Sequence, residues 1–318
     1  THASDIYLYK AASQGGATVM LAFDNSGSMG VGSILDDYNV GTTLIGQYYC
    51  KVDWLLIIPI PISPTTESVP VAIYDDNGNV TTATNNYDVT YCTVNNIRYY
   101  DRISRLKQAL IPMLANPKQA FGTGANFTSY NLGLAKFYSD NNRNAGVIAY
   151  PAKPFTLDNR KKMIEVVKNF NAETNTPSAH AYAEVGSYML GTTTKNITNS
   201  GFNLAESSSK DTNNYFSPVT PVTSSNQQQC GGNGIYFLTD GEPNSVDGNS
   251  AIDLMNSALN KVGPIANPAG TKLTVGTNTT CDANGLSSNS TTTGWNCMGK
   301  CSQLLRNTNN PVGREIIT

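Results

Sequence analysis

The 318-residue chain has few charged side chains and no excess of basic ones. Lys, Arg, Asp and Glu make up 14% of the residues, and the formal net charge is −2. Binding to nucleic acid without sequence preference depends on concentrated positive charge, so no nucleic-acid partner is expected. The polar surface must come mainly from Asn, Thr, Ser, Gln and Tyr, a composition common among secreted and cell-surface proteins.

A long hydrophobic run is also lacking. The longest apolar stretch, Trp54 to Ile62, contains two prolines and is far shorter than the ~20 residues of a membrane-spanning helix. No transmembrane segment is therefore expected. No signal peptide is visible, and we interpret Thr1-His2-Ala3 as a processed or trimmed start.

Motifs of nucleophilic and zinc-dependent catalysis are missing. The chain has two histidines, and neither Gly-x-Ser-x-Gly nor His-Glu-x-x-His occurs. Gly294 to Lys300 imitates a nucleotide-binding loop, but Cys301 stands where the magnesium-binding Ser or Thr belongs. We expect the protein not to be an enzyme, and we expect His180 to be a packed or surface histidine rather than part of a site.

The six cysteines are an even number in irregular, loop-like surroundings, which in an exported protein indicates up to three disulfides. Zinc is the alternative, but there are few histidines and no Cys-x-x-Cys pair. We expect Cys50 to pair with Cys92, because both lie in one long insertion, and leave the other pairings open. The disulfide candidates are Cys50, Cys92, Cys230, Cys281, Cys297 and Cys301.

A short apolar run, Thr18 to Asp24, is followed at once by oxygen-bearing side chains. Such a continuous run is typical of a strand buried on both faces. Asp24, Ser26 and Ser28 then follow at alternate positions, and Gly27 allows the chain to curl. Hydroxyls beside one carboxylate suit a small hard cation such as Mg²⁺. Alone, this triplet is better interpreted as a Ser/Gly turn with a helix N-cap.

Two later stretches change that interpretation. Gly234 to Asp240 is a second buried-strand pattern, and it ends in Asp240-Gly241. Between the two strands, Thr176-Pro177-Ser178 precedes the helical pattern Ala179 to Leu190, in which small residues allow close packing on a sheet.

This order of motifs resembles the von Willebrand factor A family, in which such oxygens form a metal-ion-dependent adhesion site. The resemblance covers roughly half of the chain in separated blocks. It implies an α/β fold with a doubly wound, mostly parallel, Rossmann-like sheet flanked by helices. It also implies a divalent cation, Mg²⁺ with Mn²⁺ or Ca²⁺ as alternatives, held by Asp24, Ser26, Ser28, Thr176 and Asp240.

We predict one domain over residues 1–318, truncated on its C-terminal side, with insertions at about 30–99, 191–229 and 263–296. The insertion at 191–229 is interpreted as an insertion or a mobile loop. Arg314 to Thr318 is interpreted as the start of another strand. Further strands are predicted at Asp5 to Tyr9 and, as an antiparallel edge pair, at Tyr130 to Tyr138 and Gly146 to Tyr150.

Helices are predicted at Asp101 to Ala115, Leu157 to Phe170, about Ser250 to Val262, and after Trp295. In the helices Asp101 to Ala115 and Leu157 to Phe170, we expect most Lys and Arg side chains to lie away from the buried face and in solvent. Val71 to Tyr74 and Val80 to Thr82 are predicted to form a hairpin around Asp75 to Asn79. This turn imitates a calcium loop, but Asn86 stands where the ligating Glu belongs, so a plain hairpin is favoured.

Leu238 to Asn244, Leu-Thr-Asp-Gly-Glu-Pro-Asn, together with the cysteine-bearing insertions, resembles the N-terminal part of type IV pilus tip adhesins of the PilC/PilY type. This implies an extracellular protein at the pilus tip or bacterial surface, exported through the periplasm. The expected function is surface attachment, pilus assembly and twitching motility. The expected partners are minor pilins and a host or surface ligand bound through an Asp or Glu carboxylate. The alternative is a structural pilus-assembly module whose metal site only stabilises the fold.

Overall fold

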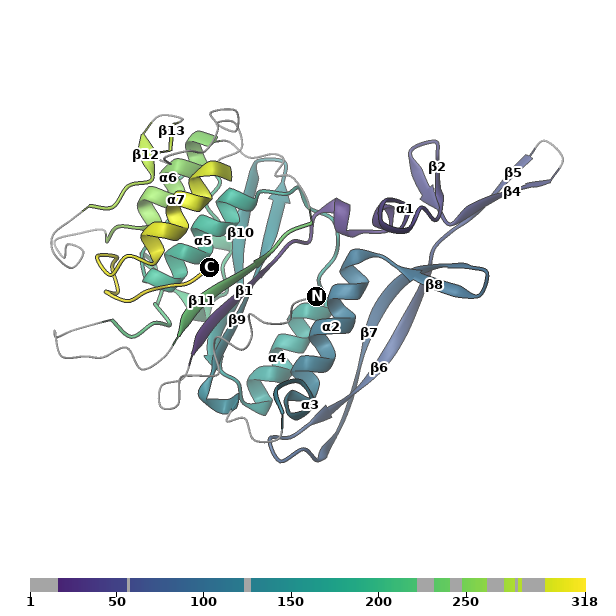
Figure 1. The fold of residues 1–318 in the computed structure, drawn as a ribbon, viewed down its shortest axis with the longest axis horizontal. Helices are drawn as coiled ribbons and strands as arrows, with labels where there is room; N and C mark the ends of the chain where they lie inside the picture. The colour runs from purple at the N-terminus through teal and green to yellow at the C-terminus, as the bar shows by residue number, and fades with distance from the viewer. Residues whose placement is uncertain are drawn as a thin grey trace. The chain divides into compact units, whose positions relative to one another are not determined.

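The computed structural model describes residues 17–55, 58–122, 127–221, 232–240, 248–261, 272–277, 280–281 and 295–318. Within these ranges the chain is mixed α/β, with seven α-helices and several β-sheets (Figure 1). The chain divides into two compact units. The first holds residues 17–24, 127–155 and the described residues from 175 onward, and the second holds residues 25–122 and 156–174. The predicted strand at Asp5 to Tyr9 and most of the insertion at 263–296 lie outside the described residues.

The first unit is built on a four-stranded mixed sheet with the strand order β10-β9-β1-β11. Its strands are β1 (Thr18–Phe23), β9 (Asn131–Asp140), β10 (Arg143–Pro154) and β11 (Asn233–Leu238). The central strand β1 is parallel to both neighbours, and β9 and β10 form an antiparallel pair at the edge. The predicted central strand and edge pair are therefore confirmed.

The last residues add to the other edge of this sheet. Ile317 forms an isolated parallel bridge with Gly234 in β11. Its N–H donates to the carbonyl of Asn233 (2.9 Å), and its carbonyl accepts from the N–H of Ile235 (2.8 Å). This pairing agrees with the predicted start of a strand near the C-terminal end.

Helices α5 (Ser178–Leu190), α6 (Gly248–Ala258) and α7 (Trp295–Leu305) gather on one face of the sheet (Figure 1). All 13 residues of α5 are buried, as its small and apolar residues predict. The helix approaches the sheet closely at Gly146 in β10, where an added Cβ would lie 2.2 Å from the Cα of Ala181. Glycine at this position is thus a condition for packing α5 against β10.

The second unit contains the predicted insertion and two of the predicted helices. Helix α2 packs on a three-stranded antiparallel sheet, β6-β7-β8, and α4 lies beside α2 (Figure 1). Two further ribbons, β2–β3 and β4–β5, belong to the same unit. The elements are α1 (Gly32–Tyr38), β2 (Thr42–Leu44), β3 (Gln47–Tyr49), β4 (Lys51–Leu55), β5 (Ile58–Ile62), β6 (Thr65–Tyr74), β7 (Val80–Val94), β8 (Ile97–Tyr100), α2 (Arg102–Ala115), α3 (Pro117–Phe121) and α4 (Leu157–Lys168).

The predicted hairpin is confirmed as β6–β7, and its turn explains the resemblance to a calcium loop. The Asp75 carboxylate accepts from the N–H groups of Asn77 (2.9 Å) and Asn79 (2.8 Å). The Asp75 N–H also donates to the carbonyl of Asn79 (2.8 Å). The bonds that the carboxylate accepts, first the one from the Asn79 N–H and then the one from Asn77, hold the pKa of Asp75 below its usual range. The acidic side chain therefore stabilises the turn itself.

The Cys50–Cys92 disulfide is confirmed, with a Cα–Cα distance of 5.3 Å. It packs with Ile34 in a small core of its own. Cys297 is also disulfide-bonded, while Cys230 lies outside the described residues. Cys301 does not fit the expectation: it is a free thiol, fully buried on α7 in the main core. Burial raises its pKa to about 12, so it acts as a small apolar side chain.

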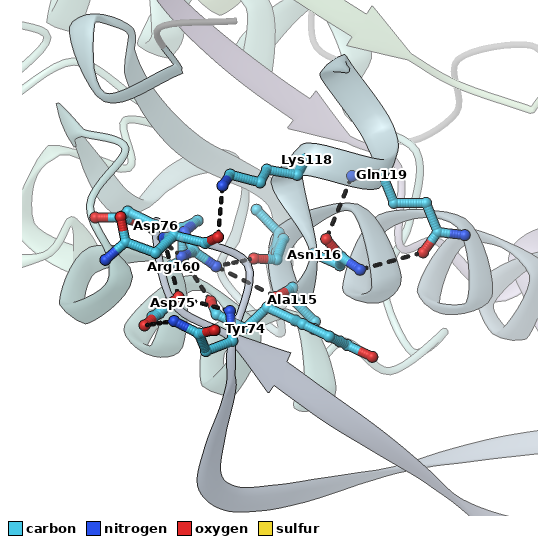
Figure 2. Close-up of polar contacts among 11 residues, drawn as sticks. Tyr74, Asp75, Asp76, Ala115, Asn116, Lys118, Gln119 and Arg160 are labelled. Carbon is cyan, nitrogen blue, oxygen red and sulfur yellow. Dashed lines mark hydrogen bonds and ion pairs between the residues drawn. The ribbon is translucent and has the colours of Figure 1, made fainter. Parts of the chain in front are cut away.

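Arg160 on α4 is fully buried, which corrects the prediction that the basic residues of this helix face solvent. Figure 2 shows its guanidinium between the end of α2 and the β6–β7 turn. Nη1 donates to the carbonyls of Leu114 (2.8 Å) and Ala115 (3.3 Å). Nη2 donates to the carbonyl of Tyr74 (2.9 Å) and to Oδ1 of Asp76 (2.9 Å). The carbonyls at the end of a helix carry partial negative charge, which favours a cation there.

Lys107 on α2 is a second correction, since it is only 6% exposed although the pattern placed it off the apolar face. Burial lowers the pKa of Lys107, against the opposing effect of the Asp101 and Asp88 carboxylates. Asp101 is the N-cap of α2 and accepts from the N–H of Ser104 (2.8 Å), and burial raises its pKa. A nearby carboxylate thus makes a buried ammonium tolerable.

Glu184 on α5 organises the irregular segment that follows that helix. Its Oε1 accepts from the hydroxyls of Thr194 (2.7 Å) and Tyr215 (2.5 Å), and its Oε2 accepts from the N–H of Gly201 (3.0 Å). Phe202, Tyr215 and Val219 are buried in the main core. The described part of the expected insertion or mobile loop, residues 191–221, therefore packs around one carboxyl group.

We predict that Arg160→Met lowers the free energy of unfolding by about 3 kcal/mol, because three carbonyls and a carboxylate lose their donor. Urea unfolding of the full chain measures this change. Lys162→Met, on the exposed side of the same helix, is the control, and we expect it to change stability by less than about 0.5 kcal/mol. Equal effects of the two substitutions would contradict the structural role of Arg160.

We predict that the protein loses stability as pH rises from about 4.5 to about 7. Burial raises the pKa of Glu184 from 4.5 to about 7, against the opposing hydrogen bonds from Tyr215, Thr194 and Gly201. In this window the folded state holds a proton that the unfolded chain has released. The contribution of Glu184 to the free energy of unfolding is therefore fully present below pH 4.5. It falls by roughly 3 kcal/mol as the pH rises through 7.

Unfolding curves across this pH range test the prediction with Glu184→Gln, in which the Thr194 and Tyr215 hydroxyls can reverse their roles. This variant should lack the Glu184 contribution to the pH dependence. Glu173→Gln, at an exposed position, should keep it. If the stability of Glu184→Gln depends on pH as that of the wild type does, groups other than Glu184 cause the pH dependence.

Candidate metal site

Asp24 lies directly after β1, at the edge of the sheet where β1 and β11 both end. The parallel register pairs Phe23 with Leu238, and the N–H of Asp24 donates to the carbonyl of Leu238 (2.9 Å). The Asp24 carboxylate is fully buried. Its Oδ2 accepts from the Thr239 hydroxyl (2.8 Å) and from the Asp240 N–H (3.4 Å). The first unit thus brings Asp24 and Asp240, two of the five predicted residues, into contact.

Ser26 and Ser28 lie at the start of the second unit, around a short 3₁₀ turn, Gly27–Met29. Their hydroxyl oxygens are 2.8 Å apart. Ser26 is buried and Ser28 is exposed. Two neutral hydroxyls at this separation, one reaching solvent, are compatible with neighbouring ligands of a hard cation.

The backbone around Ser26 is bonded to a second loop of the same unit. The carbonyl of Asn25 accepts from the N–H groups of Glu173 (3.2 Å) and Thr174 (3.4 Å). The N–H of Gly27 donates to the carbonyl of Thr174 (2.8 Å), and Ser26 forms a parallel bridge with Thr174. These bonds were not predicted, because nothing in the residue types at 173–174 indicates them.

Thr176 is buried in the first unit, two residues before α5 begins. Its carbonyl accepts from the N–H of Ser178 (2.9 Å). The preceding Asn175 is anchored to the β9–β10 pair: its N–H donates to the Ser139 hydroxyl (3.0 Å) and its side-chain amide to that of Asn144 (2.9 Å). The predicted position of Thr176 immediately before a buried helix is confirmed.

The donor set fits a hard divalent cation. The five side chains offer only oxygen, with two carboxylates and three hydroxyls. Within the described ranges no cluster of three or more His, Cys, Asp or Glu is arranged to hold a metal. The five predicted ligands are not a cluster of this kind, because three of them are hydroxyls. The convergence of all five residues on one ion stays a prediction.

His180 is packed inside the first unit, as the sequence favoured. It is fully buried; its Nδ1 lies 2.6 Å from the carbonyl of Asn144 and its Nε2 lies 2.9 Å from the Ser250 hydroxyl. It thereby links α5 to β10 and to the first turn of α6. Thr239, in the Leu238 to Asn244 sequence, is a residue of this site for which no role was predicted. Its position between a buried strand and Asp240 is the feature of the sequence that could have indicated a role at this site.

No described helix has both the length and the apolar character required to cross a membrane. No family model matches the chain, and neither a curated protein nor a solved structure matches it.

Proposed function

We propose that this chain is a metal-dependent adhesion module with the doubly wound arrangement of the von Willebrand factor A family. The observation that carries the proposal is the contact between Asp24 and Asp240 at the ends of neighbouring parallel strands. In open α/β sheets, ligands bind outside the carboxyl ends of the strands. Two further proposed donors, Ser26 and Ser28, follow Asp24 within four residues of the sequence.

The residues have distinct roles in this proposal. Asp24 and Asp240 supply negative charge, Ser26 and Ser28 supply neutral oxygens, and Thr176 adds a hydroxyl from the loop before α5. A bound Mg²⁺, Mn²⁺ or Ca²⁺ supplies a positive charge that attracts an Asp or Glu carboxylate of a partner. The burial of Asp24 excludes water from one side of the site and so strengthens that attraction.

The proposed setting is the tip of a type IV pilus or the bacterial surface, after export through the periplasm. The Cys50–Cys92 disulfide supports an oxidising compartment. The Leu238 to Asn244 sequence supports the resemblance to PilC/PilY-type adhesins. In that setting the partners are minor pilins and a host or surface ligand, and the module serves attachment and twitching motility.

A structural pilus-assembly module is the second candidate. It is favoured by the full burial of Asp24, since an ion bound there would stabilise the fold whether or not a ligand arrives. The two functions differ in a cell carrying Asp24→Asn. Loss of attachment with normal piliation supports the adhesive function, and loss of pili supports assembly.

We predict that the full chain binds Mn²⁺ and that Asp24→Asn abolishes this binding, because the variant keeps the shape of the side chain but removes its charge. Isothermal titration calorimetry with Mn²⁺ measures the affinity. Asp253→Asn, which removes an exposed carboxylate from α6 in the same unit, is the control and should bind like the wild type. Equal binding by wild type and Asp24→Asn, or no binding by either, would refute the metal site.

A further inference from the structure

We propose that Thr239 is a positioning residue for the Asp24 carboxylate, so that its hydroxyl determines how well the site holds a divalent cation. The inference rests on the proposed metal-binding function and adds a residue outside the five predicted ligands. Thr239 acts through Asp24.

The contact follows from the strand register. Thr239 is the residue after β11 and Asp24 is the residue after β1, so the register that pairs Phe23 with Leu238 places them side by side. The Thr239 hydroxyl lies 2.8 Å from Oδ2 of Asp24, shorter than the 3.4 Å bond from the Asp240 N–H to the same oxygen. The hydroxyl is therefore the stronger of these two donors.

The direction of the hydrogen bond is set by chemistry. The Thr239 hydroxyl donates to Oδ2 of Asp24, and a carboxylate that holds a cation is ionised and can only accept. Such a bond to a charged group is stronger than one between neutral groups. The main chain of Asp24 is also tied to β11 through the carbonyl of Leu238 (2.9 Å). The end of β11 thus holds Asp24 at its backbone and at its side chain.

Threonine suits this task better than a flexible donor. Its branched Cβ restricts χ1, so the hydroxyl loses little freedom when it holds one direction. Groups that orient a metal-binding side chain affect affinity without touching the metal, and their removal typically costs 10–100-fold. Thr239 is partly buried, which limits competition from water.

The test compares Thr239→Val, which keeps the branched shape without the hydroxyl, with Thr239→Ser, which keeps the hydroxyl. We expect Thr239→Val to weaken Mn²⁺ binding by roughly 10–100-fold and Thr239→Ser to retain most of the affinity. Calorimetry on the full chain measures both, and urea unfolding without metal measures stability. Thr212→Val, at an exposed position of the same unit, is the control.

A purely structural role would reduce the metal-free stability of Thr239→Val and leave its Mn²⁺ affinity unchanged, and that result would overturn the inference. Equal weakening in Thr239→Val and Thr239→Ser would also overturn it, because the variant that keeps the hydroxyl would then bind no better than the one that lacks it. If Thr239→Val does not fold, Thr239→Ala provides the same comparison. Failure of the wild type to bind Mn²⁺ would refute the proposed function itself. Wild-type affinity in Thr239→Val, with binding lost in Asp24→Asn, would refute this inference alone.

Discussion

The parallel pairing of β1 with β11 is the constraint on which the candidate site depends. It brings Asp24 and Asp240, 216 positions apart in the chain, to one edge of the sheet. A buried carboxylate costs several kcal/mol unless donors or a cation replace its water. The end of β11 supplies two such donors, the Thr239 hydroxyl and the Asp240 N–H. The strand pairing and the chemistry of the site are therefore parts of one arrangement.

Buried polar side chains on helix α5 hold neighbouring segments that lack regular secondary structure in one conformation. Although every residue of α5 is buried, Glu184 and His180 both have hydrogen-bond partners. Glu184 gathers Thr194, Gly201 and Tyr215, and His180 joins β10 to α6 through Ser250. An unsatisfied buried group is costly, so each of these contacts disfavours other paths for the segments involved. We infer that this network specifies the conformation of residues 191–221.

Local patterns were enough to predict the elements that position the site. The apolar run of β1, the apolar face of α2 and the Asp75 turn depend on nearby residues, and all three elements were found where expected. Cys50 and Cys92 were paired correctly because they share an insertion. The contact of Asp24 with Asp240 follows from the rule that parallel strands end at the same edge.

Other features depend on partners that no local pattern reveals. The burial of Arg160 requires carbonyl groups 45 to 86 positions away, so an amphipathic pattern on α4 alone places it in solvent. Cys301 is a free buried thiol although Cys297 on the same helix is disulfide-bonded, a difference that cysteine counting cannot detect. The role of Thr239 depends on strand register, and the bond between Gly27 and Thr174 joins two loops without any shared motif.

Backbone hydrogen bonds restrain the two loops that carry the predicted hydroxyl ligands. The carbonyl of Asn25 and the N–H of Gly27 are both bonded to residues 173–174, so this part of the Asp-x-Ser-x-Ser loop cannot shift far without them. Asn175 is separately bonded to Ser139 and Asn144. A ligand-driven movement of Thr176 must therefore either break the two Asn175 bonds or stay within residues 176–177. The Asn175 bonds are made by an exposed residue and compete with water, so they are the cheaper ones to break. We infer that any displacement of Thr176 begins with the loss of the Asn175 bonds to Ser139 and Asn144.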